Sequence, residues 1–224
     1  MPLEVVCFCG YYMNKAVPSR QEDWYSYKWI QALKGHSVNG YAKVPVRGVS
    51  KRLTHENRSS AVEWFGIFVG DYFESGDIGG PFVVVPVPNS DCTGDSGVKP
   101  RTRKLAKAIC DVFDDGSFMV DCLRWKKNLG SAREGGPREP DILFKNLALQ
   151  KDDLRGALED LEDGTAVILV DDVTTSGGHL QASAAKLNTF GMKVDHVVCA
   201  GKTVYDQTNP AFYNYEYSLE EFES

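Results

Sequence analysis

Apolar and polar residues follow two different periods along this chain, and the period separates expected strands from expected helices. Two short runs are almost continuously apolar, "FVVVPV" at 82–87 and "TAVILV" at 165–170. Such runs are typical of strands that are buried on both faces of a parallel sheet. Further strands are expected at 117–123, where apolar and polar residues alternate, and at 193–201.

Apolar residues that recur every three or four positions predict helices between and before these strands. The expected helices span residues 20–34, 58–74, 98–113, 150–162 and 178–190. Gly35 and Gly191 follow the first and the last of them, where glycine commonly ends a helix. The alternation of strand and helix from residue 82 onward predicts an α/β fold with a doubly wound parallel sheet.

Three segments fall outside this alternation. Residues 1–55 are expected to be irregular and are rich in aromatic side chains, so we divide the chain into an N-terminal extension, 1–57, and a core, 58–224. Residues 124–146 form a long polar segment, and long loops within compact domains are usually functional or disordered. The last twenty residues are expected to add an edge strand or to cover the sheet.

Composition narrows the class of protein. The chain has 224 residues and a formal net charge of −6, which argues against broad nucleic-acid binding because such binding needs a basic face. It has no apolar run of about 18 residues, as a membrane span would need, and no secretory signal, so we expect a cytoplasmic protein without a membrane partner. Six cysteines in a chain of this kind are expected to be reduced thiols.

The most informative stretch is "VILVDDVTTSGGH" at 167–179, in which an apolar strand runs into Asp171 and Asp172. Ligands of open parallel sheets bind at the carboxyl ends of the strands. Two adjacent carboxylates repel each other, and Mg²⁺ or sugar hydroxyl groups would compensate them. The hydroxyl residues and glycines that follow lie before a helix N-terminus, which favours an anion. The spacing therefore suits a ribose 5-phosphate.

Two other interpretations of the aspartate pair explain less. A phospho-acceptor receiver domain also gathers aspartates at strand ends, but it would need another acidic site and a lysine, and it leaves the glycine turn unexplained. A purely structural interpretation makes Ser176 the helix N-cap, but it leaves two carboxylates without compensation.

The same stretch resembles the phosphoribosyl pyrophosphate (PRPP) motif of type I phosphoribosyltransferases. The order of a "VPVP" strand end, a basic helix and a "DDV-x-T-T-G" turn is most similar to ComF-type proteins of that family. The resemblance implies a type I phosphoribosyltransferase fold in which the N-terminal aromatic residues form a hood. It also implies an enzyme that binds PRPP and Mg²⁺, transfers the phosphoribosyl group to a small-molecule acceptor and releases pyrophosphate.

The resemblance assigns roles to individual residues. Asp171 and Asp172 would bind the ribose hydroxyl groups and the metal. The 5-phosphate would be held by Thr174, Thr175, Ser176, Gly177, Gly178 and His179. Pyrophosphate would be bound by Val87, Pro88, Asn89, Ser90, Lys99, Arg101 and Arg103. A flexible catalytic loop within 124–146 would contribute Lys126, Lys127 and Arg133.

Several of these assignments have plain structural alternatives, namely a proline-rich turn at 87–90, a solvated basic face at 99–103 and a solvent loop at 124–146. His179 stands where many relatives have threonine or serine. Thr175 stands where purine-salvage relatives have aspartate, which argues against a 6-oxopurine acceptor. Trp24, Tyr27 and Trp29 either stack on a base or belong to the core.

The function and the partners also have alternatives. The chain is either a phosphoribosyltransferase or a non-catalytic PRPP or nucleotide sensor, or a partner-binding effector, that uses the same pocket. The family resemblance is compatible with a homodimer and with a regulatory protein or nucleic-acid partner. ComF-type relatives often carry a zinc module with paired cysteines, but this chain has only Cys7 and Cys9 before the core, so no zinc is expected.

Overall fold

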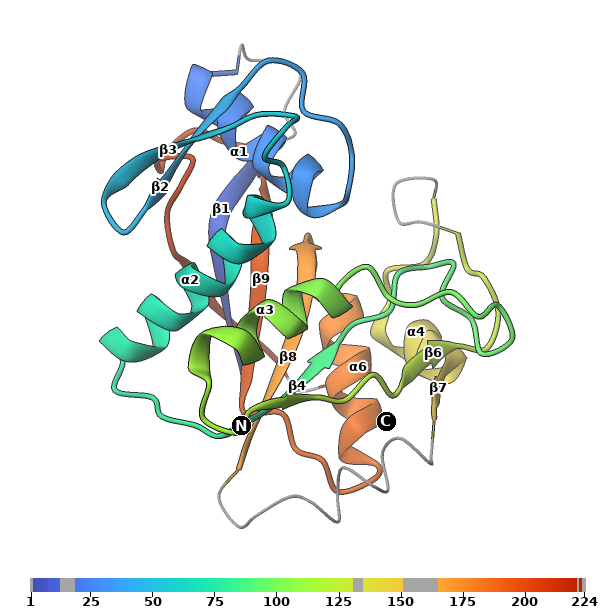
Figure 1. Ribbon diagram of the computed structural model, residues 1–224. Helices are drawn as coiled ribbons and strands as arrows, with labels where there is room; N and C mark the ends of the chain where they lie inside the picture. The colour runs from blue at the N-terminus through green and yellow to red at the C-terminus, as the bar shows by residue number, and fades with distance from the viewer. Residues whose placement is uncertain (1, 13–18, 131–134, 151–164, 221, 223–224) are drawn as a thin grey trace.

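The computed structural model describes residues 2–12, 19–130, 135–150, 165–220 and 222. Within these residues a six-stranded sheet forms the centre of the molecule (Figure 1). From one edge to the other its strands are β10 (Tyr215–Leu219), β1 (Leu3–Tyr12), β9 (His196–Val204), β8 (Ala166–Thr174), β4 (Phe82–Pro86) and β5 (Phe118–Met119). All neighbouring pairs are parallel except β10 with β1. The prediction of an α/β fold with a mainly parallel sheet is confirmed.

Helices cover both faces of this sheet, as a doubly wound arrangement requires. Alternate residues of β4 and β8, such as Val84 and Ile168, lie in a core with the helices of one face. Their neighbours Val83 and Leu169 lie in a second core on the other face. The first core is covered by α1 (Gln21–Leu33), α2 (Ser60–Ser75) and α3 (Arg103–Phe113), and the second by α6 (Gly178–Asn188) (Figure 1).

Smaller elements are attached to the two ends of this framework. A hairpin of β2 (Ala42–Val46) and β3 (Val49–Leu53) packs near α1, and its buried apolar residues belong to the first core. A short antiparallel pair, β6 (Leu123–Trp125) and β7 (Leu147–Leu149), lies with α4 (Pro140–Asn146) on the side of α6 (Figure 1). None of the described helices has the length and apolar character that crossing a membrane would require.

The expectation that residues 1–55 are irregular is wrong for the first strand and for the β2–β3 hairpin. The run "LEVVCFCGYY" forms β1, which pairs with β9 on one side and with β10 on the other. Nearly every residue of β1 is buried, as expected for an interior strand with a helix layer on each face. The division at residues 57 and 58 stays a prediction about domains, and the central sheet crosses it. The expected C-terminal edge strand is confirmed as β10.

Other expected boundaries shift for local reasons. The helix expected at 98–113 begins at Arg103, because Pro100 disfavours helical geometry in the residue before it. The strand expected at 117–123 is divided, because β5 ends at Met119 and the next strand, β6, begins at Leu123 and pairs with β7. The polar segment 124–146 is not a loop throughout, since it contains α4 and most of β6. The helix expected at 150–162 falls almost wholly outside the described residues.

Candidate functional site

Asp171 and Asp172 lie near the carboxyl end of β8, at the edge of the sheet where parallel strands present their ligands. The strand continues through both residues to Thr174, because β9 pairs with it along that length. Asp172 is paired with two cations from other parts of the chain. Its Oδ1 lies 3.6 Å from Nζ of Lys34, and its Oδ2 lies 3.8 Å from a guanidinium nitrogen of Arg101.

The two carboxylates are only partly compensated. Burial and the negative charge of Asp172 raise the pKa of Asp171 to about 8, and the backbone N–H of Asp172, which donates to Asp171 Oδ1 at 2.7 Å, offsets this in part. Carboxylates at a strand end that favour an added positive charge suit a hard cation, which prefers oxygen ligands. The described residues contain no cluster of three or more His, Cys, Asp or Glu that could hold a metal alone. Mg²⁺ commonly binds through one or two carboxylates together with substrate phosphates and water, so the pair fits that ion.

The turn after β8 offers hydroxyl groups and backbone N–H groups. Thr175 and Ser176 are exposed, and Thr175 Oγ1 lies 2.8 Å from Thr203 Oγ1. Thr174 is buried and accepts a hydrogen bond from the Tyr217 hydroxyl at 3.3 Å. Gly177 is the N-cap of α6 and makes no side-chain cap, so the interpretation of Ser176 as the N-cap is wrong. The hydroxyl group of Ser176 is therefore exposed beside a helix N-terminus.

Gly177 of this turn is required by its backbone conformation, and Gly178 by close packing. Gly177 has a φ of +83°, and a Cβ atom there would lie 2.5 Å from Cδ1 of Leu219 in β10. A Cβ atom on Gly178 would overlap the carbonyl oxygen of Arg138. The N-terminus of α6 is thus held between β10 and the segment that precedes α4.

His179 is the second residue of α6, and its ring packs edge-on against Trp125 with 5.5 Å between the ring centroids. Burial lowers the pKa of His179, and the charge of Asp172 opposes this effect. The neutral imidazole therefore serves as an aromatic packing group between α6 and β6. Its predicted part in phosphate binding, through the backbone N–H, stays a prediction.

The predicted pyrophosphate loop at 87–90 is anchored to β8 and to the start of α3. The backbone N–H of Val87 donates to the Val170 carbonyl at 2.9 Å, and the hydroxyl of Thr102 donates to the Val87 carbonyl at 2.6 Å. Asn89 Oδ1 accepts a hydrogen bond from the backbone N–H of Arg101 at 2.9 Å. Val87 and Pro88 are buried, whereas Asn89 and Ser90 are half-buried. This loop consequently holds Arg101 in place beside Asp172.

The three cations predicted at 99–103 separate in the structure. Arg101 reaches Asp172, whereas Arg103 forms an ion pair with the buried Asp121, which Arg124 also binds. Lys99 is exposed. Lys99 and Arg101 precede α3, which begins at Arg103.

The structure does not bring the predicted catalytic lysines to the aspartate pair. Nζ of Lys126 donates to the Lys145 carbonyl at 2.6 Å, and Lys127 is exposed. Within the described part of the chain, neither lysine forms an ion pair with Asp171 or Asp172. Arg133 lies outside the described residues. The roles of these three residues stay predictions.

Two cations near Asp172 were missed by the sequence analysis. Lys34 follows α1 as its C-cap, and Lys104 lies beside it, because a Cβ atom on Gly35 would be 3.8 Å from Lys104 Nζ. Burial lowers the pKa of Lys104, Arg101 lowers it further, and Asp172 raises it. The basic run at 101–104 gave a weak signal for Lys104. Lys34 had none, because only the folded chain brings the end of α1 to β8.

The N-terminal aromatic residues divide between core and surface. Trp29 is fully buried and donates its indole N–H to the Ala61 carbonyl at 3.3 Å, so it is a core residue. Tyr27 stacks on Tyr11 with 5.6 Å between the ring centroids. Trp24 is 52% exposed and packs edge-on against Tyr27. Of the three proposed stacking residues, Trp29 is therefore excluded.

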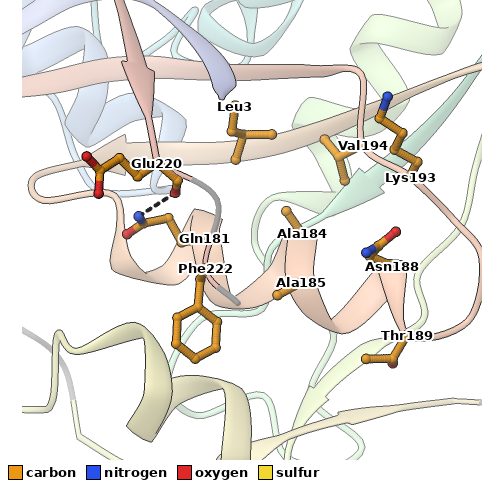
Figure 2. A pocket seen from close by; sticks show the side chains of 10 residues that line it. All are labelled: Leu3, Gln181, Ala184, Ala185, Asn188, Thr189, Lys193, Val194, Glu220 and Phe222. Carbon is orange, nitrogen blue, oxygen red and sulfur yellow. Dashed lines mark hydrogen bonds between the residues drawn. The ribbon is translucent and has the colours of Figure 1, made fainter. Parts of the chain in front are cut away.

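A separate cavity of about 370 Å³ lies near the other end of the sheet. Figure 2 shows its lining side chains, which come from α6 (Ala184, Asn188), the start of β1 (Leu3) and the C-terminal segment (Phe222). Because the parallel strands begin at this end, the cavity is not part of the site at Asp171 and Asp172.

Comparisons with known proteins leave the family of this chain open. No protein-family model matches it, and no curated protein matches it. Among solved structures, it is similar to a crystal structure of APRTase from Giardia lamblia complexed with 9-deazaadenine. The sequence identity is 12%, the match covers 84% of this chain and 100% of that one, and the TM-score is 0.36. This likeness is too low to support an assignment, so function must be inferred from the site.

Proposed function

We propose that this protein binds PRPP together with Mg²⁺ and transfers the phosphoribosyl group to a small-molecule acceptor, with release of pyrophosphate. One observation carries the proposal. Two adjacent carboxylates at the end of β8 are followed directly by an exposed hydroxyl turn at the N-terminus of α6. Acidic groups that would bind a sugar and a metal therefore adjoin hydroxyl and N–H groups that would bind a phosphate.

Different residues would bind different parts of PRPP. Asp171 and Asp172 would bind the ribose hydroxyl groups and Mg²⁺, and the turn from Thr174 to Gly178 would hold the 5-phosphate. Arg101, which the loop at 87–90 fixes beside Asp172, would face the diphosphate. When bound, Mg²⁺ would help to neutralise the charge that develops on the leaving diphosphate.

The reaction needs no covalent nucleophile from the protein. The bond between the anomeric carbon and the diphosphate oxygen breaks, the acceptor forms a bond to that carbon, and the sugar passes through an oxocarbenium-like state. Positively charged groups fixed beside the leaving group stabilise its charge, and a ligand held at both ends reacts from a favourable orientation. In this chain, the side chain of Arg101 and the α6 turn would supply those two effects.

The acceptor is expected not to be a 6-oxopurine, because Thr175 occupies the place of a purine-binding aspartate in the resemblance. Its hydroxyl is already close to that of Thr203. We further propose that α1 and the β2–β3 hairpin form the hood of a type I phosphoribosyltransferase fold. A ComF-type relationship, a cytoplasmic location and a homodimer are parts of the same proposal.

A PRPP or nucleotide sensor is the second candidate function. It is favoured by Lys126, whose ammonium group binds the carbonyl of Lys145 and makes no ion pair with the described aspartate pair. A sensor needs the binding residues but has no need of a catalytic loop that closes on the leaving group.

Calorimetric titration with PRPP, with and without Mg²⁺, tests the proposal on the wild type and on Asp171→Asn and Asp172→Asn. We expect each variant to bind PRPP at least about 10-fold more weakly in the presence of Mg²⁺, because each loses a carboxyl group that would ionise on binding the metal. Asp111→Asn, on the exposed surface of α3, is the matched control and should bind as the wild type does. Equal affinities of all four proteins would refute PRPP binding at this site.

Release of pyrophosphate separates the two candidate functions. The wild-type protein is incubated with PRPP, Mg²⁺ and a panel of nucleobases, and free pyrophosphate is measured. Release that depends on one acceptor, and that Asp172→Asn abolishes, supports the transferase. Tight binding of PRPP without acceptor-dependent release supports the sensor.

A further inference from the structure

Three cations from two separate segments converge on one carboxylate at the end of β8. We call Lys34, Arg101 and Lys104 the cation cluster. Lys34 and Arg101 lie 3.6 and 3.8 Å from the carboxylate oxygens of Asp172, and Nζ of Lys104 lies close to Gly35, next to Lys34. Lys34 is the C-cap of α1, Arg101 lies in the segment just before α3, and Lys104 lies in the first turn of α3.

The cation cluster carries more positive charge than Asp172 can compensate. Arg101 and Lys104 repel each other, and this repulsion lowers the pKa of Lys104 together with burial. The side chain of Lys34 is only 20% exposed, so water screens its charge weakly. Like charges that are held together and partly withdrawn from water favour a multiply charged anion as their ligand.

The position of Lys34 is set by its own helix and by β1. Its backbone N–H donates to the Ile30 carbonyl at 3.0 Å, and Gly35 follows with a φ of +85°, which turns the chain away. Nζ of Lys34 lies 5.7 Å from the centre of the Tyr11 ring. Lys28 on the same helix instead donates to the Tyr41 carbonyl at 3.0 Å. Lys34 is therefore placed at the site by the fold, whereas Lys28 has a structural partner.

We infer that Lys34, together with Lys104, adds to Arg101 in holding the diphosphate of the proposed ligand, and that Lys34 makes the site select ligands with a diphosphate over ribose 5-phosphate. The inference rests on the proposed function for the role of the α6 turn, which would hold the 5-phosphate. Lys34 reaches the site from the side of α1 and α3, whereas the turn lies at the start of α6 on the opposite face of the sheet. Substitution of Lys34 should consequently weaken the binding of the diphosphate end of the ligand and leave the binding of the 5-phosphate end unchanged.

The test is calorimetric titration of the full-length protein with two separate probes, inorganic diphosphate and ribose 5-phosphate, at constant ionic strength and with and without Mg²⁺. In Lys34→Met we expect the affinity for diphosphate to fall about 10-fold or more, because a charge-assisted contact is lost. The affinity for ribose 5-phosphate should change by less than about 2-fold, since the expected contacts of that probe lie at α6. Lys34→Arg should keep most of the affinity for diphosphate.

Lys28→Met is the matched control and should bind both probes as the wild type does. Diphosphate binding that is unchanged in Lys34→Met would overturn the inference, and so would an equal loss of both probes. If Lys34→Met does not fold, Lys34→Gln and Lys104→Met carry the same comparison. Failure of the wild type to bind diphosphate also overturns the inference. Failure to bind ribose 5-phosphate, with diphosphate binding intact and dependent on Lys34, counts against the proposed function instead.

Discussion

Gly177 and Gly178 are held between two segments that are distant from them in the sequence. Leu219 of β10 lies against the first glycine, and the carbonyl of Arg138 lies against the second. The sequence analysis explained these glycines by function, because a phosphate needs backbone N–H groups close to it. The structure adds a packing requirement, which no local pattern could predict because both neighbours are brought in by the fold.

Substitution Gly178→Ala should destabilise the protein by about 1–3 kcal/mol, because the new methyl group meets a backbone carbonyl that cannot rotate away. The free energy of unfolding is measured by urea denaturation. Gly79→Ala is the control, since nothing lies within 4 Å of a Cβ atom at that position. If the two substitutions have the same effect, the close approach of Arg138 to α6 is wrong.

Among single residues, the aspartate pair was predictable and its ion pairs were predictable only in part. Asp171 and Asp172 end an apolar run, and strand ends of that kind carry ligands. Arg101 was predicted from the basic run near α3. Lys34 was not, because its contact with Asp172 spans more than a hundred residues of sequence and depends on where α1 packs.

At the level of elements, the local sequence pattern predicted the bounds of β4 and α6 closely. It also predicted β8, but it placed the end of that strand too early. The predicted strand ended at Val170, whereas hydrogen bonding with β9 carries it to Thr174. β1 was missed because its aromatic and cysteine-containing sequence was interpreted by composition. Its partner is set by a long-range pairing of Val5 with Val197. Such pairings are tertiary information, which an apolar run alone does not contain.

The start of β9 gives a pH-dependent contribution to stability. His196 packs against Phe73 with 5.1 Å between the ring centroids, and burial lowers the pKa of His196 although Asp195 opposes this. A base whose pKa is depressed in the folded state binds protons better when unfolded. Its contribution is therefore complete above about pH 6.5, the ordinary pKa of histidine, and is lost as the pH falls below that value.

We expect His196→Gln to reduce the loss of stability that the wild type shows between about pH 7.5 and pH 5, by up to about 1.4 kcal/mol per pH unit. Urea denaturation at a series of pH values measures the slope. His36→Gln, at an exposed histidine, is the control for replacing a histidine by glutamine. A slope that is identical in His196→Gln and in the wild type would contradict the effect of burial.

At the scale of the whole molecule, the candidate site is assembled from segments on both sides of the predicted boundary at residues 57 and 58. Lys34 comes from the N-terminal segment, whereas Arg101 and Asp172 come from the core. The sheet beneath them is also shared, because β1 lies between β9 and β10. Residues 1–57 therefore contribute to the site and to its support, which goes beyond the hood that the sequence predicted.

A chain that begins at residue 58 is consequently expected not to fold. It would lack β1, so that β9 loses one neighbour and β10 loses its only partner in the described sheet. It would also lose the buried side chains of α1 and of the β2–β3 hairpin from the first core, including Trp29 and Leu53. The free energy of folding that this buried apolar area contributes exceeds the marginal stability of a domain of this size.

Cooperative thermal unfolding followed by circular dichroism measures the outcome, and a chain that begins at residue 3 is the control. If the shorter chain unfolds cooperatively near the temperature of the control, the N-terminal segment is a separable domain and the continuity of the sheet through β1 is wrong.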